Sequence, residues 1–377
     1  MIPTGYHESA FRLPDGQVAC LRRAGVPTPG VANTTLIRAV EHFAGRRIFV
    51  AGPGAAATLL WATRRGAEVT YWTENLAEAQ SVAATCAANA CPLPTTHCAP
   101  DFSGLEPGAF DTVLLHLPRG QYLQRELLQL GAALLAPGGW LAFGGATREG
   151  IRSALQVARE IFGQAGITTR KGGYHAGLAQ RPTGDFPLPA DAFTCREITV
   201  SGAPTQLHSR PGVFAWDRLD EGAATLIDHM HVTAGQQALD LGCGPGLVGL
   251  AALRQGAHVT LVDVSAWAVA AAQRTLAANG YPEAPVWHSH GAEAVATQRF
   301  DVVLTNPPFH QGHGVNFEVA QRFIHDAAHV LHPGGKLYLV ANSFLDYGTA
   351  LTEHFSDVRP VGETTRFRVW EGVARAR

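Results

Sequence analysis

The most informative stretch of the chain is Asn306-Pro307-Pro308-Phe309. It follows an apolar run over residues 300–305 that is typical of a buried parallel strand. Two consecutive prolines end the strand ladder and stiffen the turn, because neither has a backbone N–H. The stretch therefore predicts an amide side chain and several carbonyl groups that could accept hydrogen bonds from an exocyclic amine. Asn-Pro is also an ordinary turn former, so this interpretation needs support from elsewhere.

That support comes from a glycine-rich turn upstream. An apolar strand over residues 238–241 leads into Gly242, Gly244 and Gly246. Glycines let the backbone approach a ligand, and the helix that follows offers free N–H groups. The glycines alone also fit a dinucleotide fingerprint. Asp240 argues against a dinucleotide ligand, because a carboxylate at this strand end would repel a pyrophosphate. The same carboxylate could pair with the ammonium group of an amino-acid-like ligand.

A second carboxylate, Asp263, ends the next apolar strand. An acidic residue at this position accepts hydrogen bonds from ribose hydroxyls. S-adenosylmethionine carries both an aminoacyl end and a ribose. The two carboxylates therefore predict a site for S-adenosylmethionine.

In these motifs the chain from about residue 200 onward resembles a class I methyltransferase domain. Residues 306–310 resemble the form found in rRNA guanine-N2 methyltransferases of the small-subunit methyltransferase C and large-subunit methyltransferase G type. Residues 212–222 resemble the segment that leads into the catalytic domain of that family. The resemblance implies methylation of the exocyclic N2 amine of a guanosine in ribosomal RNA, with small-subunit (16S) rRNA favoured as the substrate.

The resemblance also implies roles for individual residues. Asn306, Pro307, Pro308 and Phe309 would be catalytic, with Phe309 stacked on the base and His310 beside it. The implied cofactor contacts are Asp220, Asp240, Gly242, Gly244, Gly246, Asp263, His290, Glu293 and Asn306. One departure concerns the adenine contact, because Ser289-His290-Gly291 stands where the family often has Asp or Asn, with Glu293 as a nearby alternative.

The N-terminal half reads as a second copy of the same fold. At a shift of 190 positions, Gly52 and Gly54 align with Gly242 and Gly244. Residues identical at this shift include Leu60, Gly66, Thr85, Asn89, Phe110 and Asp111. Residues 137–139 match residues 333–335 at a shift of 196, which implies a six-residue insertion in residues 310–316.

The two copies differ at the positions that would do the chemistry. Val50 stands in place of Asp240, and Thr73 in place of Asp263. His116-Leu117-Pro118 replaces Asn306-Pro307-Pro308. The first copy is therefore expected to keep the fold without the cofactor site, although another ligand at the same crevice stays open.

These patterns predict an α/β protein with two tandem Rossmann-like domains, each built on a mostly parallel, doubly wound sheet. A chain of 377 residues exceeds one typical core. We expect a degenerate domain over residues 1–186 that recognises RNA and a catalytic domain over residues 187–377. The best linker candidate is the proline-rich stretch 181–189, and residues 195–200 are expected to form a small strand.

Charge is distributed unevenly between the two halves. The net charge of −2 is not typical of a nucleic-acid binder. Residues 1–190 hold 16 Lys and Arg against 13 Asp and Glu, whereas residues 191–377 hold 13 against 18. Paired cations suited to phosphate contacts are Arg22-Arg23, Arg46-Arg47, Arg64-Arg65 and Arg170-Lys171. Each pair could equally be a solvated surface.

Composition limits the class of protein further. No apolar run reaches bilayer length and the N-terminus lacks secretory features, so a cytoplasmic protein without a membrane partner is expected. The six cysteines lack Cys-x-x-Cys spacing, which favours reduced thiols over a metal site. The proposed chemistry requires no metal.

Three alternatives stay open. One is methylation of another amine, either adenine N6 or glutamine N5, although such enzymes usually carry Tyr or Trp where Phe309 stands. Another is a nicotinamide-dependent oxidoreductase. The third is an RNA-binding or ribosome-assembly protein without activity.

Overall fold

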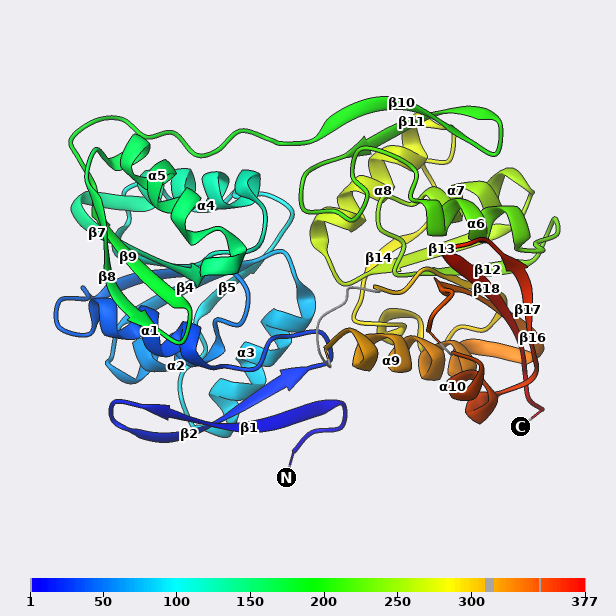
Figure 1. The fold of residues 1–377 in the computed structure, drawn as a ribbon, viewed down its shortest axis with the longest axis horizontal. Coiled ribbons are helices and arrows are strands. Elements are labelled where there is room, and N and C mark those ends of the chain that lie inside the picture. The colour runs from blue at the N-terminus through cyan, green and yellow to red at the C-terminus, as the bar shows by residue number, and fades with distance from the viewer. Residues whose placement is uncertain (1, 309–314, 346, 377) are drawn as a thin grey trace. The chain divides into compact units, whose positions relative to one another are not determined.

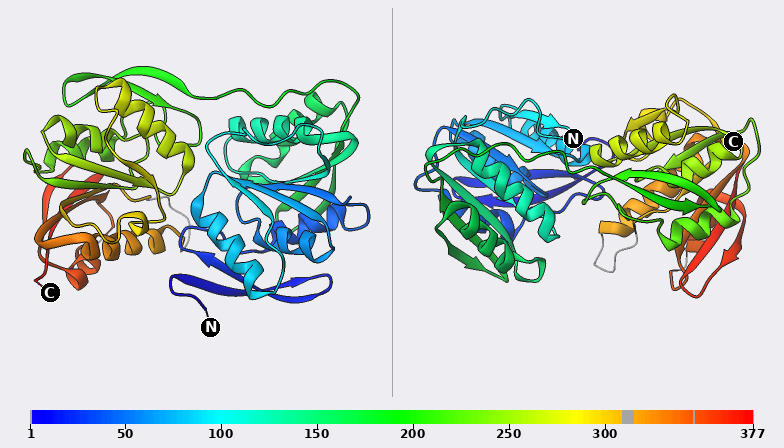
Figure 2. Two further views of the ribbon diagram at one scale, coloured as in Figure 1. Left: turned by 180° about the vertical axis from the view of Figure 1, so that it is seen from behind. Right: turned by 90° about the horizontal axis from the view of Figure 1, so that it is seen from above.

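The computed structural model describes residues 2–308, 315–345 and 347–376. The chain forms two compact units, Met1–Asp191 and Ala192–Arg377. The boundary expected after residue 186 lies a few residues before this division. Each unit is described by itself below (Figures 1 and 2).

In unit 1 the helices and strands are β1 (Tyr6–Leu13), β2 (Gly16–Arg23), α1 (Val31–Val40), β3 (Arg47–Ala51), α2 (Ala56–Arg64), β4 (Glu68–Thr73), α3 (Leu76–Ala88), β5 (Thr95–Cys98), β6 (Phe110–His116), α4 (Gln121–Leu134), β7 (Leu135–Ala146), the 3-10 helix η1 (Thr147–Glu149), α5 (Ile151–Phe162), β8 (Ala165–Lys171) and β9 (Tyr174–Gln180).

In unit 2 they are β10 (Thr194–Val200), β11 (Ala203–Ser209), α6 (Glu221–His229), β12 (Gln237–Leu241), α7 (Leu247–Arg254), β13 (His258–Asp263), α8 (Ala266–Ala278), β14 (Val286–His288), the 3-10 helix η2 (Glu293–Val295), β15 (Phe300–Thr305), α9 (Val315–Val330), β16 (Leu331–Asn342), α10 (Tyr347–His354), β17 (Phe355–Glu363) and β18 (Phe367–Ala374).

Each unit is built on a seven-stranded sheet of the same topology. The strand order is β5-β4-β3-β6-β7-β9-β8 in unit 1 and β14-β13-β12-β15-β16-β18-β17 in unit 2. The first five strands of each order run parallel, and β9 and β18 run antiparallel to their neighbours. The expectation of two doubly wound, mostly parallel sheets is confirmed.

Strand register bears out the alignment of the two halves. Val50 lies opposite Tyr71 and Leu114, and Asp240 lies opposite Leu261 and Leu304, so both ladders keep the shift of 190. The next ladder pairs Val113 with Leu141 in unit 1 and Val303 with Leu337 in unit 2. Equivalent residues therefore differ by 190 on β6 and β15, and by 196 on β7 and β16.

Helices cover both faces of each sheet. In unit 2 the helices α6, α7 and α8 share one core with Ala238 and Leu304, whereas α9 and α10 share another with Leu239 and Val303. Successive residues of a strand point to opposite faces, so a strand buried on both faces is apolar along its length. This explains why the strand segments read as nearly continuous apolar runs.

A two-stranded hairpin precedes each sheet and is clamped to a helix by two side chains. In unit 1 the Thr85 hydroxyl bonds both backbone groups of Leu21 (3.0 and 3.1 Å), and the Asn89 amide bonds those of Ala19. In unit 2 Thr275 and Asn279 of α8 bond His208 and Gln206 of β11 in the same way. This shared clamp explains why Thr85 and Asn89 have the same residue types as Thr275 and Asn279 in the other half. The short strand expected at 195–200 is part of β10.

Within the described residues, no helix is both long and apolar enough to span a membrane.

Candidate active site

The turn between β12 and α7 forms a cradle at the carboxyl end of the sheet. Gly242, Gly244 and Gly246 have φ values of +77°, +53° and +83°, the left-handed region that favours glycine. A Cβ on Gly244 would meet no atom within 4 Å, so this face of the turn opens onto free space. A Cβ on Gly242, by contrast, would lie 2.7 Å from the ring of Phe323. The turn can therefore admit a ligand close to its backbone at Gly244.

Asp240 lies buried beside this turn. Its Oδ2 accepts a hydrogen bond from the N–H of Gly249 at 2.8 Å, which ties the strand end to α7. Burial raises the pKa of Asp240 to about 7, and the nearby Asp263 adds to the shift while the Gly249 N–H opposes it. An approaching cation would favour the ionised form of this carboxyl group.

Asp263 closes the other side of the turn. Its Oδ2 accepts from the N–H of Gly244 and its Oδ1 from the N–H of Ser265, both at 2.9 Å. Burial raises the pKa of Asp263 despite these bonds. Neither Asp240 nor Asp263 has an ion-pair partner among the residues that the structure describes. Two uncompensated carboxylates beside an open glycine turn fit a ligand that carries a cation and hydroxyl groups.

Asn306 follows β15 at the same edge of the sheet. Its Nδ2 donates to Oδ2 of Asp220 at 3.2 Å. The same oxygen caps α6 by accepting from the N–H groups of Gly222 and Ala223, at 2.9 and 3.2 Å. A carboxylate can only accept, so the amide nitrogen must face Asp220, and Oδ1 of Asn306 is turned away from it.

The proline turn is described only in part. Pro307 is buried and Pro308 is exposed. Phe309 and His310 lie outside the described residues, so their expected contacts with the base remain predictions.

Thr305, which the sequence reasoning missed, joins β15 to β12 beside the crevice. Its buried hydroxyl donates to the carbonyl of Leu241 at 2.8 Å, beyond the last ladder pair between Asp240 and Leu304. The ends of β12 and β15 are thus joined through a side chain instead of a backbone bond. A threonine directly before Asn306 is the sequence signal that could have pointed to this bond.

On the side expected to hold adenine, Glu293 is engaged by Arg322. The guanidinium donates to Oε1 of Glu293 at 2.9 Å and also lies 3.3 Å from Oδ2 of Asp326. His290 is buried, and its carbonyl lies 3.4 Å from Arg322. Arg322 and Asp326 were not anticipated, because they lie on α9, far along the chain. The adenine contacts expected of His290 and Glu293 stay predictions.

The corresponding crevice of unit 1 is closed. A Cβ on Gly52 would overlap the backbone carbonyl oxygen of His116. The β3–β6 ladder there runs one pair further than its counterpart, to Ala51 opposite Leu115. The His116 ring is buried against the Thr58 hydroxyl at 2.9 Å, and burial lowers its pKa to about 4. The backbones at the ends of β3 and β6 therefore meet in unit 1, and a Cβ on Gly54, the equivalent of Gly244, would lie 3.4 Å from Pro27.

A different carboxylate serves the glycine turn of unit 1. Oε1 of Glu78, on α3, accepts from the N–H of Gly54 at 2.9 Å, as Asp263 does from Gly244. Burial raises the pKa of Glu78 to about 7. Glu78 therefore makes the hydrogen bond to the glycine turn of unit 1 that Asp263 makes in unit 2, although Thr73 stands at the position of Asp263.

The first arginine pair differs from the expectation of exposed phosphate contacts. Arg23 is only 5% exposed, and its guanidinium lies 4.8 Å from the centre of the Tyr6 ring. Arg22 is half-buried. A cation stacked on an aromatic ring and withdrawn from solvent is poorly placed to bind phosphate, so the phosphate contact expected of Arg23 stays a prediction without support from its burial.

Two other pairs, Arg46-Arg47 and Arg64-Arg65, are exposed but partly engaged. Arg47 forms an ion pair with Asp111 at 2.7 Å, which lowers the pKa of that carboxyl, whereas Arg46 is exposed. Arg64 pairs with Asp15 at 3.0 Å.

Arg65 is exposed as well, but its guanidinium stacks 5.0 Å from the centre of the Trp61 ring. Its Nη1 also donates to the carbonyl of Glu41 at 2.9 Å. Both arginines of this pair therefore already have partners within unit 1.

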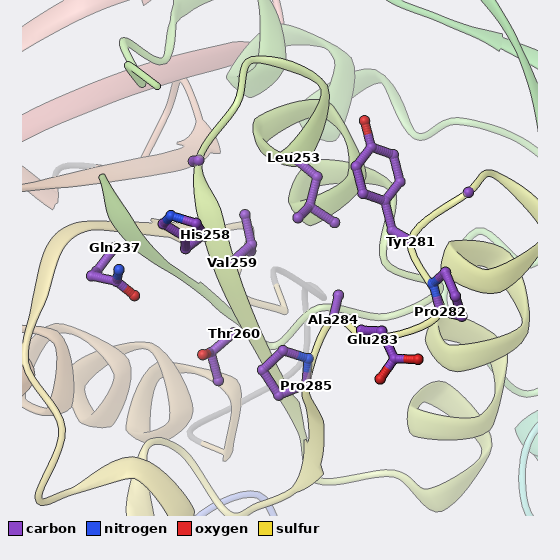
Figure 3. A pocket seen from close by; sticks show the side chains of 12 residues that line it. Gln237, Leu253, His258, Val259, Thr260, Tyr281, Pro282, Glu283, Ala284 and Pro285 are labelled. Atoms are coloured by element: carbon purple, nitrogen blue, oxygen red, sulfur yellow. The ribbon is translucent and has the colours of Figure 1, made fainter. Parts of the chain in front are cut away.

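Two further features lie away from this crevice. A pocket of about 380 Å³ is lined by Gln237, His258 and residues 280–285, at the amino ends of β12 and β13 (Figure 3). All six cysteines are free thiols. Among the described residues, no group of three or more His, Cys, Asp or Glu side chains is placed to hold a metal.

Fold and site together define a methyltransferase. Residues 204–371 match the family described as Methyltransferase small domain, and residues 34–168 match Methyltransferase small domain N-terminal. The ribosomal RNA small subunit methyltransferase C of Stutzerimonas stutzeri is 37% identical over 71% of this chain and 80% of its own length. That of Klebsiella pneumoniae is 36% identical over 70% and 75%. The chain belongs to the ribosomal RNA small subunit methyltransferase C family.

A solved structure extends the likeness to the whole chain. A Thermus thermophilus protein, described as a 16S rRNA N2 G1207 methyltransferase in complex with AdoMet and guanosine, superposes with a TM-score of 0.85. It is 28% identical to this chain, and 98% of each chain is covered.

Proposed function

We propose that this enzyme transfers a methyl group from S-adenosylmethionine to the exocyclic N2 amine of a guanosine in 16S rRNA. The observation that carries the proposal is the Asn306 amide, which Asp220 orients at the carboxyl end of β15. The relatives named above support the substrate, and the Thermus thermophilus protein points to the guanosine equivalent to G1207. Family membership weighs against adenine, glutamine and large-subunit rRNA as substrates.

The residues of the glycine turn would hold the cofactor. Asp240 would pair with the ammonium of its aminoacyl end, and Asp263 would accept hydrogen bonds from its ribose. Gly242, Gly244 and Gly246 would let the backbone approach it. Bound S-adenosylmethionine supplies an electrophilic methyl group on a sulfonium.

Asn306 and the Pro307 carbonyl would bind the substrate amine. The lone pair of a guanine N2 amine is delocalised into the ring, so the amine is a weak nucleophile. Acceptance of its two N–H groups by Oδ1 of Asn306 and the carbonyl of Pro307 would orient the nitrogen. It would also stabilise the positive charge that develops on it. A paired guanine must leave its helix to reach such a site.

Unit 1 would recognise the RNA. It carries the excess of cations, and its crevice at Gly52 is closed. The roles assigned to residues 1–186 and 187–377 rest on this contrast. The partner would be ribosomal RNA or a ribosomal subunit, which places the activity in the cytoplasm.

The decisive experiment maps N2-methylguanosine in 16S rRNA from a strain that lacks this protein. We expect one modified guanosine to lose its methyl group, and purified enzyme with S-adenosylmethionine to restore it. Unchanged modification of 16S rRNA would refute the proposal.

Asn306→Ala tests the central residue. We expect the rate of methyl transfer to fall at least tenfold, because loss of one preorganised polar group commonly costs ~2.7–4 kcal/mol. Calorimetry should find the affinity for S-adenosylmethionine within a few-fold of the parent. Full turnover by this variant would remove Asn306 from the catalytic residues.

A further inference from the structure

One corner of unit 1 collects cations that have no acidic partner. Arg148 lies in η1 directly after β7, Arg152 lies in the first turn of α5, and Arg170 and Lys171 end β8. All four side chains are exposed. Within the part of the chain that the structure describes, none of them lies within 4 Å of a carboxylate. We call these four residues the basic corner.

Backbone contacts bring these residues together. The N–H of Thr147 donates to the carbonyl of Gly173 at 2.9 Å, which ties η1 to the tip of the β8–β9 hairpin. Arg170 lies directly opposite His175 in that hairpin, and the Thr147 hydroxyl lies 3.4 Å from Nε2 of His175. Strand β9 lies between β7 and β8 (Figure 1).

Two of the cations share the face of the sheet that α5 covers. Opposed residues of antiparallel strands lie on the same face, and Gly145, His175 and Arg170 form such a row. A Cβ on Gly145 would lie 3.9 Å from Ile151 of α5, which identifies the face. Arg170 therefore lies on the face of the sheet covered by α5, whose first turn carries Arg152. Lys171 follows on the opposite face of the same edge.

The equivalent corner of unit 2 is electrically balanced. There the N–H of Ser343 donates to the carbonyl of Arg366 at 2.9 Å, which matches the bond from Thr147 to Gly173. Arg366 is paired with Glu221 at 2.6 Å, and Arg368 with Glu363 at 2.6 Å.

Alignment of the two corners shows how the charges differ. The position equivalent to Arg148 is Phe344, at the shift of 196. The position equivalent to Arg170 is Glu363, because Glu363 lies opposite Arg368 in the β17–β18 hairpin as Arg170 lies opposite His175. Among the described residues, the cations at this corner are therefore paired with carboxylates in unit 2 and not in unit 1.

We propose that the basic corner binds the phosphate backbone of the rRNA substrate. The inference rests on the proposed function and adds the surface through which unit 1 would act. Three of the four cations are arginines, whose planar guanidinium can donate two hydrogen bonds to one phosphate. Such contacts position RNA without reading its sequence, which is left to the site at Asn306.

The test removes the four charges together. The variant carries Arg148→Gln, Arg152→Gln, Arg170→Gln and Lys171→Gln. A matched control removes four exposed cations elsewhere on unit 1, through Arg12→Gln, Arg38→Gln, Arg125→Gln and Arg159→Gln. Binding of a 16S rRNA transcript is measured from 50 to 200 mM KCl. Calorimetry with S-adenosylmethionine and a thermal melt check that site and fold are intact.

We expect the basic-corner variant to bind the transcript at least tenfold more weakly. The slope of log K against log salt should fall by roughly 3, because each phosphate contact contributes about 0.7–0.9. The control should keep both the parental affinity and the parental slope. Affinity for S-adenosylmethionine should be the same in all three proteins.

Three results would overturn the inference. The basic-corner variant could bind the transcript as tightly as the parent, or the control could lose as much affinity. A defect seen with ribosomal subunits and not with naked rRNA would assign the corner to a protein partner.

If the parent enzyme itself fails to methylate 16S rRNA, the proposed function fails. If it succeeds and the variant keeps the parental KM, only the basic corner is refuted.

Discussion

At the scale of single residues, the bond between Asp220 and Asn306 gives the site its polarity. One carboxylate oxygen serves both as the cap of α6 and as the acceptor for the Asn306 amide. The sequence resemblance assigned Asp220 to the cofactor. The bond to Asn306 suits a second role that we propose for it, as a positioning residue, with its other oxygen left for a cofactor contact.

Substitution of Asp220 can separate these roles. Serine caps helices about as well as aspartate but is too short to reach Asn306, whereas asparagine can do both through its carbonyl oxygen. We expect Asp220→Ser to lower kcat at least tenfold with nearly unchanged thermal stability, and Asp220→Asn to stay close to the parent. Weaker cofactor binding in Asp220→Ser, with kcat intact at saturation, would instead favour a cofactor contact.

The raised pKa of Asp240 predicts a pH dependence of cofactor binding. With a pKa of about 7, the free carboxyl is mostly protonated at pH 5.5 and half ionised at pH 7. An ammonium group binds the ionised form, so affinity should rise about tenfold over this range, with uptake of cofactor releasing protons. Calorimetry in buffers of different ionisation enthalpy measures both effects. Asp240→Asn should bind weakly at every pH, and an unchanged pH slope in that variant would exclude Asp240 as the cause.

The same shift acts on stability in the absence of cofactor. A carboxyl group whose pKa is raised in the folded state contributes stability below its ordinary pKa, and this contribution is lost as the pH rises through about 7. Asp240 and Glu78 both act in this direction, one in each unit.

At the scale of elements, the clamps between helix and hairpin explain why the two aligned halves both have threonine at Thr85 and Thr275. Thr85 and Thr275 are both fully buried, and each bonds the N–H and the carbonyl of one hairpin residue. The pairing spans more than sixty residues, so no local spacing announces it. The hairpins themselves are too short to be stable alone and depend on this attachment.

Thr275→Val tests the clamp with little change of shape. Loss of the hydroxyl leaves two partly buried backbone groups of His208 without this partner, which should cost about 1–3 kcal/mol. We expect faster amide hydrogen exchange in β11, measured by mass spectrometry, and little change in unit 1. Thr297→Val, at an exposed position, serves as the control. Equal protection of β11 in both variants would contradict the clamp.

The sequence predicted features that depend on neighbouring residues, but not contacts between segments that lie far apart along the chain. Strand ends, glycine turns and the two copies follow from local patterns, and the methyltransferase fold they predicted is confirmed. The bonds from Thr305 to Leu241 and from Arg322 to Glu293 join segments that only the folded sheet brings together. The buried state of Arg23 was equally hidden, because a pair of arginines reads as a charged surface in any sequence.

At the scale of the whole molecule, the two units should divide the work. Among the described residues, the open glycine turn with two carboxylates lies in unit 2, so calorimetry of the full chain should find one S-adenosylmethionine site. An isolated second unit, from residue 192, should bind the cofactor but methylate rRNA poorly, because the basic corner and the excess of cations lie on the first. A thermal melt with and without cofactor controls for damage from the cut. Full activity of the folded fragment would make the first unit dispensable for recognition.

The closed crevice of unit 1 also has an evolutionary meaning. Restoring acids at Val50 and Thr73 would place two carboxylates beside a backbone that has already met across the gap, from Gly52 to His116. Val50 is fully buried, so an unpaired charge there would destabilise the unit without creating room for a ligand. Because the described residues of unit 1 hold no cofactor site to preserve, catalysis does not constrain substitutions on its surface.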